Sequence, residues 1–235
     1  MTDLTQLKTD ELKKRLKWKC PLEGHSKHDG ICHKNCYDQL HSTDTREKIG
    51  FIDIETEDLR ADYSIVFCYC IKDRNSNKIY SDAITLEDIR KYSNKDRNKM
   101  PIEDIRILKN LIQDMSKFTR LVGHFSSLFD LPFIRSRAVM CGIDYPIYGQ
   151  YVQTDTWRIL KSKFKLSRNS LENSCQKLLG STMKDHLSLA IKHGCIRGEP
   201  WALKASLEHC RKDVLDTERL YNAINIFARQ TNSSI

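Results

Sequence analysis

The chain has 235 residues, of which 40% are hydrophobic and 30% are charged. This composition is sufficient to bury a full core, and it argues against overall disorder. The formal net charge of +8 favours a polyanionic partner but is only weak support for one. No run approaches the roughly 18 apolar residues of a membrane span, and the N-terminus lacks the order of a signal peptide. We therefore expect a soluble, cytoplasmic protein with no membrane partner.

Residues 1–45 are predicted to form a small module of their own. Leucines and basic residues are interleaved at helical spacing in residues 1–19, which predicts a short basic helix. Residues 20–41 are dense in cysteine, histidine and glycine and have almost no aliphatic side chains. Such a segment cannot build its own hydrophobic core, so another force must order it.

A cluster of cysteines and histidines offers that force. Four ligands suited to tetrahedral Zn²⁺ follow the spacing x4, x7 and x2, namely Cys20, His25, His33 and Cys36. The final ligand set stays open because His28, Cys32 and His41 lie nearby. A closed site of this kind would be structural. The six other cysteines lack metal-site spacing and are predicted to be small buried hydrophobes: Cys68, Cys70, Cys141, Cys175, Cys195 and Cys210.

Residues 46–235 are predicted to form one α/β domain. Strands are expected at 49–54, 63–71 and 78–81, as a meander that opens a sheet. A helix over 102–118 is indicated by the spacing of Ile105, Leu108, Ile112 and Met115. The elements expected after it are a strand at 121–124, a helix at 132–140, a break at 141–146 and several short helices from 171, the last at 203–228. This order predicts a mixed central sheet flanked by helices.

Four carboxylates lie in or beside apolar runs of this domain, where a charge is costly to bury unless it is paired or holds a metal. They are Asp53, Glu55, Asp130 and Asp213. Alternation along a strand puts Asp53 and Glu55 on one face. His209 and Asp213 are four residues apart on a helix, so they also share a face. The four carboxylates together are typical of a site for hard divalent cations.

The segments around these carboxylates resemble, in order, the three sequence blocks of the DEDD (DnaQ-like) 3′-5′ exonucleases. They are Phe-Ile-Asp53-Ile-Glu55-Thr, Gly123-His124-x4-Phe129-Asp130-x-Pro132-Phe133, and His209-Cys-Arg-Lys-Asp213-Val. These motifs are most similar to those of the proofreading domain of family B DNA polymerases and its stand-alone relatives. The resemblance spans about residues 48–226. The resemblance implies a ribonuclease H-like fold, to which the zinc-binding element would be added.

The resemblance also implies roles for the acidic residues. Asp53, Glu55 and Asp213 would hold one Mg²⁺ or Mn²⁺ ion, and Asp53 with Asp130 would hold a second. His209 stands where this family usually has a tyrosine, and a sister branch has its histidine one residue earlier. Either side chain could orient the attacking water, and only histidine is suited to accept its proton near neutrality. A surface histidine without a catalytic role is the alternative.

Substrate contacts are expected near the first two blocks. Thr56 directly follows the first block. In the family, the residues after this block line the pocket for the 3′ end. In the second block Phe125 replaces a common asparagine, and His124 or Ser126 could make the contact in its place. Residues 157–168 mix basic and aromatic side chains, as in single-stranded nucleic-acid sites, although an ordinary solvated helix face would look the same.

The function expected from the sequence is a metal-dependent 3′-5′ exonuclease acting on single-stranded DNA or RNA 3′ ends and releasing nucleoside monophosphates. Any proofreading would occur in trans, in association with a replication or repair complex. Two alternatives remain: a catalytically silent nucleic-acid-binding module and a ribonuclease H-like endonuclease. The choice between DNA and RNA stays open.

Overall fold

The protein is described by a computed structural model covering residues 13–19, 47–92, 101–146, 150–183 and 185–228. The chain divides into two compact units, Met1–Glu47 and Lys48–Ile235. In the first unit, residues 13–17 are helical. The predicted zinc ligands Cys20, His25, His33 and Cys36 lie outside the described residues, so the zinc-binding element stays a prediction.

The second unit is built on a five-stranded mixed sheet with the order β3-β2-β1-β4-β5. The strands are β1 (Ile49–Thr56), β2 (Val66–Asp73), β3 (Ile79–Ala83), β4 (Arg120–Gly123) and β5 (Val152–Asp155). The first three strands form an antiparallel meander, whereas β4 pairs parallel with β1, and β5 pairs parallel with β4. The strand that carries the first predicted carboxylates therefore lies at the centre of the sheet.

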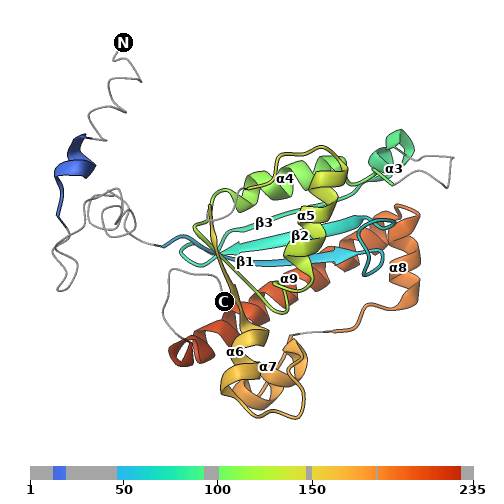
Figure 1. Cartoon of the computed structure of the whole chain (residues 1–235). Helices are drawn as coiled ribbons and strands as arrows, with labels where there is room; N and C mark the ends of the chain where they lie inside the picture. The colour runs from blue at the N-terminus through green and yellow to red at the C-terminus, as the bar shows by residue number, and fades with distance from the viewer. Residues whose placement is uncertain (1–12, 20–46, 93–100, 147–149, 184, 229–235) are drawn as a thin grey trace. The chain divides into compact units, whose positions relative to one another are not determined.

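Helices cover both faces of this sheet. They are α3 (Leu86–Tyr92), α4 (Ile105–Met115), α5 (Asp130–Met140), α6 (Thr156–Lys163), α7 (Leu171–Leu179), α8 (Leu189–Ile196) and α9 (Pro200–Ile224), followed by the short turn Asn225–Phe227. Figure 1 shows α4 and α5 on one face and the long α9 on the other. This layering is compatible with a ribonuclease H-like fold. Within the described ranges, no helix combines the length and apolar character needed to cross a membrane.

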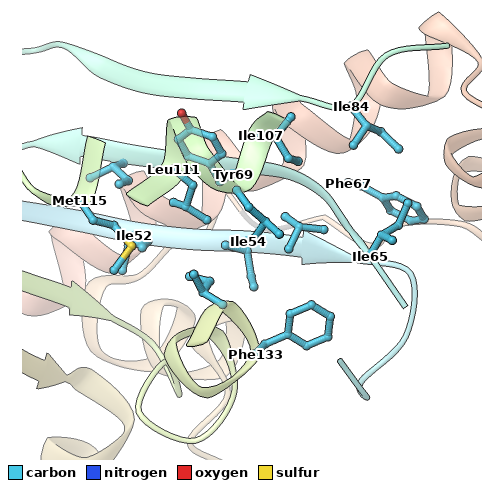
Figure 2. Close-up of a cluster of buried hydrophobic side chains, with 14 of the residues drawn as sticks. Ile52, Ile54, Ile65, Phe67, Tyr69, Ile84, Ile107, Leu111, Met115 and Phe133 are labelled. Atoms are coloured by element: carbon cyan, nitrogen blue, oxygen red, sulfur yellow. The ribbon is translucent and has the colours of Figure 1, made fainter. Parts of the chain in front are cut away.

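The core beneath α4 and α5 is formed by alternate residues of the central strands. Ile52 and Ile54 of β1 and Tyr69 of β2 are buried against Leu111 and Met115 of α4 (Figure 2). Each fully buried aliphatic side chain of this size contributes about 1.5–3 kcal/mol. The Tyr69 hydroxyl lies at the edge of this layer and donates a 2.6 Å hydrogen bond to Asp114. This face of the sheet is thus filled by side chains and leaves the opposite face for α9.

The core beneath α9 uses the other set of alternate residues. Phe51 of β1 and the thiols of Cys68 and Cys70 on β2 pack with Cys210 and Val214 of α9. Small thiol side chains let the helix approach the sheet closely. Of the six cysteines predicted to be buried hydrophobes, five are buried and all six are free, while Cys141 is half-buried.

A third cluster anchors the C-terminal half of α9. Leu160 of α6, Cys175 of α7 and Leu220 and Ile224 of α9 are buried together. Both short helices begin with side-chain caps: Asp155 accepts from the Trp157 amide, and Ser170 accepts from the Asn173 amide. With both halves packed, α9 is held along its length.

The structure departs from the sequence expectations at several element boundaries. β2 begins at Val66 rather than residue 63 because the preceding residues form a loop in which the Ser64 hydroxyl donates to Arg60 O. Two short elements, α3 and β5, were not predicted from the sequence. The apolar face predicted for α4 was only partly correct. The buried residues of this helix are Ile107, Leu108, Leu111 and Met115.

A fully buried ion pair joins α5 to the start of α4. Arg137 Nη2 donates to Asp104 Oδ1 at 2.6 Å, and its Nε donates to Asp104 Oδ2 at 3.1 Å. Arg137 also donates to the carbonyls of Ala61 and Pro101. Asp104 Oδ2 accepts the Val66 amide as well, at 3.0 Å. Loss of one partner would leave the other charge buried without its counter-ion.

We therefore predict that Arg137→Ala lowers the free energy of unfolding by about 3–5 kcal/mol, as is typical when a buried ion pair is broken. Urea denaturation followed by circular dichroism measures this. Arg135→Ala, an exposed arginine of the same helix, is the matched control and should cost less than about 1 kcal/mol. Equal stability of the two variants would contradict the assigned role of the pair.

Candidate metal centre

Strand β1 directs two carboxylates toward α9. Because Ile52 and Ile54 fill the core beneath α4 and α5, the alternating residues Asp53 and Glu55 face the other way. The Cys210 thiol donates to the carbonyl of Asp53 at 3.3 Å, which fixes α9 against this part of the strand. Both carboxylates are half-buried. The predicted shared face of Asp53 and Glu55 is present.

Helix α9 adds a histidine and a third carboxylate to the same place. His209 Nε2 lies 3.5 Å from Glu55 Oε1 and 3.8 Å from Asp213 Oδ2. Ligand atoms of Glu55, His209 and Asp213 all lie within 4.8 Å of one another. His209 and Asp213 are 6% and 4% exposed, so they are not an ordinary solvated helix face.

Asp130 enters the site from the start of α5. The β1–β4 pairing ends at Phe51 and Val122, and beyond it the Ile54 amide donates to Asp130 Oδ1 at 3.1 Å. Asp130 therefore accepts a backbone hydrogen bond from β1 beyond the point where β4 stops pairing with this strand. The pKa of Asp130 is raised to about 7, chiefly by burial and also by the negative charges of Asp155 and Asp213, while two backbone hydrogen bonds oppose the rise. The carboxylates of Asp130 and Asp213 are therefore close enough for their charges to interact.

Asp185 is a neighbour of the site that the sequence analysis missed. Its carboxylate contacts His209 Nδ1 and accepts a hydrogen bond from Lys212 Nζ at 2.5 Å. The hydrogen bonds from Lys212 and then His209 lower the pKa of Asp185 to about 2. The ionised carboxylate accepts, so Nδ1 donates to Asp185, and Nε2 lies on the side of Glu55 and Asp213. No spacing signal in the sequence links Asp185 to His209, since they are brought together only by the fold.

Asp155 is a second residue that sequence reasoning missed. It is fully buried and accepts from the amides of Phe125, Ser127 and Trp157 and from the Ser127 hydroxyl. It thereby ties the loop before α5 to the start of α6. An aspartate directly before a helical segment is the pattern of an N-cap, and this signal could have identified it.

The predicted substrate contacts are held by internal hydrogen bonds. The Thr56 hydroxyl donates to Asp58 O at 2.8 Å, beside the end of β1. His124 Nδ1 lies 2.9 Å from the Thr156 hydroxyl, and Nε2 lies 2.9 Å from Asn169 O. Both side chains thus shape the segments next to the carboxylates, and their contact with a substrate stays a prediction.

The donor set fits a hard divalent cation. Carboxylate oxygens are the preferred ligands of Mg²⁺ and Mn²⁺, and such ions need only a few protein ligands because water and substrate phosphate complete the shell. Glu55 and Asp213 lie close enough to share one ion. The structure therefore contains a candidate metal centre formed by an acidic pair and a histidine.

The fold is similar to that of the family B DNA polymerase from the hyperthermophilic archaeon Pyrobaculum calidifontis, with a TM-score of 0.53. The match covers 75% of this chain and 24% of the polymerase chain, at 15% sequence identity. A likeness at this identity concerns the fold alone. No protein-family model matches the chain, and no curated protein matches it in sequence.

We predict that Asp130→Asn stabilises the metal-free protein. The folded pKa of Asp130 is raised from 3.8 to about 7, so the wild type loses stability as pH rises through this interval. Asparagine keeps an acceptor for the Ile54 amide but removes the charge. Each pKa unit corresponds to about 1.4 kcal/mol, and we expect a gain of at least about 1 kcal/mol at pH 8.

Thermal unfolding in chelator at pH 8 and at pH 4 tests this prediction. The difference between variant and wild type should shrink at the lower pH, because pH 4 lies close to the unfolded pKa of 3.8 and Asp130 is protonated in the folded chain. A variant that is less stable than the wild type at pH 8 would show that the buried charge of Asp130 does not destabilise the metal-free protein.

Proposed function

We propose that the protein is a metal-dependent 3′-5′ exonuclease that releases nucleoside monophosphates from single-stranded DNA or RNA. The observation that carries the proposal is the convergence of Glu55, Asp213 and His209 from β1 and α9 on one shielded face. Asp130 reaches the same region from α5. The fold likeness to a family B DNA polymerase and the order of the three sequence blocks support it further.

In this proposal the carboxylates hold two Mg²⁺ or Mn²⁺ ions. Asp53, Glu55 and Asp213 would hold the first, and Asp53 with Asp130 would hold the second. Bound divalent ions supply Lewis-acid stabilisation of the charge that develops on the scissile phosphate. The repulsion between the clustered carboxylates opposes folding, and the bound cations would relieve it.

His209 is the proposed general base. Its Nε2 lies on the side of Glu55 and Asp213, where it can accept a proton from a water molecule positioned at the 3′-terminal phosphodiester. Asp185 acts through His209: by accepting from Nδ1 it fixes the ring orientation and the tautomer. Lys212 in turn orients Asp185.

The first test is digestion of 5′-labelled single-stranded DNA and RNA oligonucleotides in the presence of Mg²⁺ or Mn²⁺. We expect a ladder that shortens from the 3′ end and is abolished by chelator. Asp53→Ala should reduce the rate by more than about 100-fold, since even ligand-supporting residues typically contribute 10–100-fold. Asp144→Ala, an exposed aspartate just beyond the C-terminal end of α5, is the matched control and should retain full activity.

Other outcomes of the same assay separate the alternatives. Oligonucleotides that stay intact but are retained by the protein would favour the silent binding module. Cleavage of a circular single strand would favour an endonuclease. Equal rates for Asp53→Ala and Asp144→Ala would remove the carboxylate site from the chemistry altogether.

The role of Asp185 gives a separate prediction. Asp185→Asn should lower kcat by about 10–100-fold and leave KM nearly unchanged, because the variant binds substrate but no longer fixes the His209 tautomer. Single-turnover kinetics on a labelled oligonucleotide measure this. Lys212→Met is the control, since it removes a partner of Asp185 but leaves its contact with His209, and it should have the smaller effect. A normal kcat for Asp185→Asn would exclude the positioning role.

A further inference from the structure

Phe125 has a backbone conformation that is unfavourable for its side chain. Its φ is +66°, in the left-handed region that glycine and asparagine tolerate much better. Phe125 is 40% exposed, so part of this residue remains accessible to solvent. A strained residue of this kind is retained only where the surrounding structure holds it, and such residues cluster at binding sites.

The fully buried carboxylate of Asp155 holds this conformation. Its Oδ1 accepts from the Phe125 amide at 2.8 Å and also from the Trp157 amide at 2.9 Å. One oxygen atom therefore fixes the backbones of two aromatic residues. The two rings meet edge to face, with centroids 5.1 Å apart and an interplanar angle of 82°. We call Phe125 and Trp157 the aromatic pair.

Basic side chains accompany the aromatic pair. Lys161 Nζ lies 4.8 Å from the centroid of the Trp157 ring. The exposed Arg158 donates from Nε to the Ser127 hydroxyl at 2.8 Å, and Ser127 is itself held by Asp155. Aromatic rings with cations beside them suit single-stranded nucleic acid, because bases stack on the rings while phosphates meet the cations.

Phe125, one member of the aromatic pair, lies on the loop that leads into a candidate metal ligand, while Trp157 lies in the first turn of α6. Phe125 O accepts from the amides of Leu128 and Phe129, and Ser126 O accepts from the Leu131 amide. These bonds form the turn that leads directly into Asp130 at the start of α5. A nucleic-acid strand whose 3′-terminal nucleotide lies at the carboxylates would thus place a neighbouring nucleotide near this loop.

We propose that Phe125 and Trp157 form a stacking platform for a base of the single-stranded substrate, with Lys161 and Arg158 contacting its phosphates. The inference rests on the proposed function for the identity of the occupant. It also accounts for the phenylalanine at a left-handed position, where an asparagine would be less strained but would offer no ring.

The test uses Phe125→Asn, which relieves the backbone strain and removes the ring. Binding of a short 5′-fluorescein-labelled oligothymidylate is measured by fluorescence anisotropy in EDTA, and the melting temperature is measured in parallel. We expect binding about tenfold weaker, within the range for one stacked base, and a melting temperature equal to or above that of the wild type. Phe227→Asn is the matched control: Phe227 is also exposed and meets Phe164 edge to face, and this variant should bind as the wild type does.

A second measurement separates this inference from the proposed function. Hydrolysis of the p-nitrophenyl ester of thymidine 5′-monophosphate with Mn²⁺ reports the carboxylate site without a second base. Equal rates for Phe125→Asn and wild type, together with weaker oligonucleotide binding, would support the platform. An inactive wild type would contradict the exonuclease but leave the binding result decisive. The platform is overturned if the wild type does not bind the oligonucleotide, if Phe125→Asn binds within twofold of it, or if this variant is less stable.

Discussion

The close packing of α9 against β1 is the contact on which the rest of the structure depends. It brings ligand atoms of Glu55 on the strand and of Asp213 and His209 on the helix within 4.8 Å of one another, on a largely buried face. Like charges in such a place repel and oppose folding. The contact is sustained by the packing of Phe51 and the small thiol side chains with α9, and by the donation from Cys210 to the strand backbone. The protein therefore accepts a local cost that a divalent cation would relieve.

The remaining elements limit how far this arrangement can relax. Ile52 and Ile54 fix the orientation of β1 from the opposite face, so a shift of register would exchange carboxylates for isoleucines. Asp130 replaces a ladder hydrogen bond of the same strand. Asp155 and Asp185 are carboxylates near the site that accept hydrogen bonds and so hold their neighbours in place. The acidic residues at and near the site thus form two groups: some face the candidate metal centre, and the others position neighbouring side chains.

Local periodicity explains which parts of this arrangement were predictable. Alternation along β1 placed Asp53 and Glu55 on one face, and the i, i+4 spacing placed His209 beside Asp213. The strand order and the late start of β2 depend on loops whose hydrogen bonds have no simple sequence pattern. Asp185 could not be found because it meets His209 only through tertiary packing. Asp155 had a capping signal that went unused, and the unfavourable φ of Phe125 is a backbone property invisible in the sequence, although its departure from the common asparagine marked the position.

We infer that the acidic face formed by β1 and α9 binds divalent cations. Anomalous diffraction from crystals soaked in Mn²⁺ tests it most directly, because it locates the ion independently of any substrate or activity. We expect Mn²⁺ density bound by the carboxylates of Glu55 and Asp213, and a second ion beside Asp130. The same maps with no density at these carboxylates, under conditions in which Mn²⁺ occupies other sites, would contradict it.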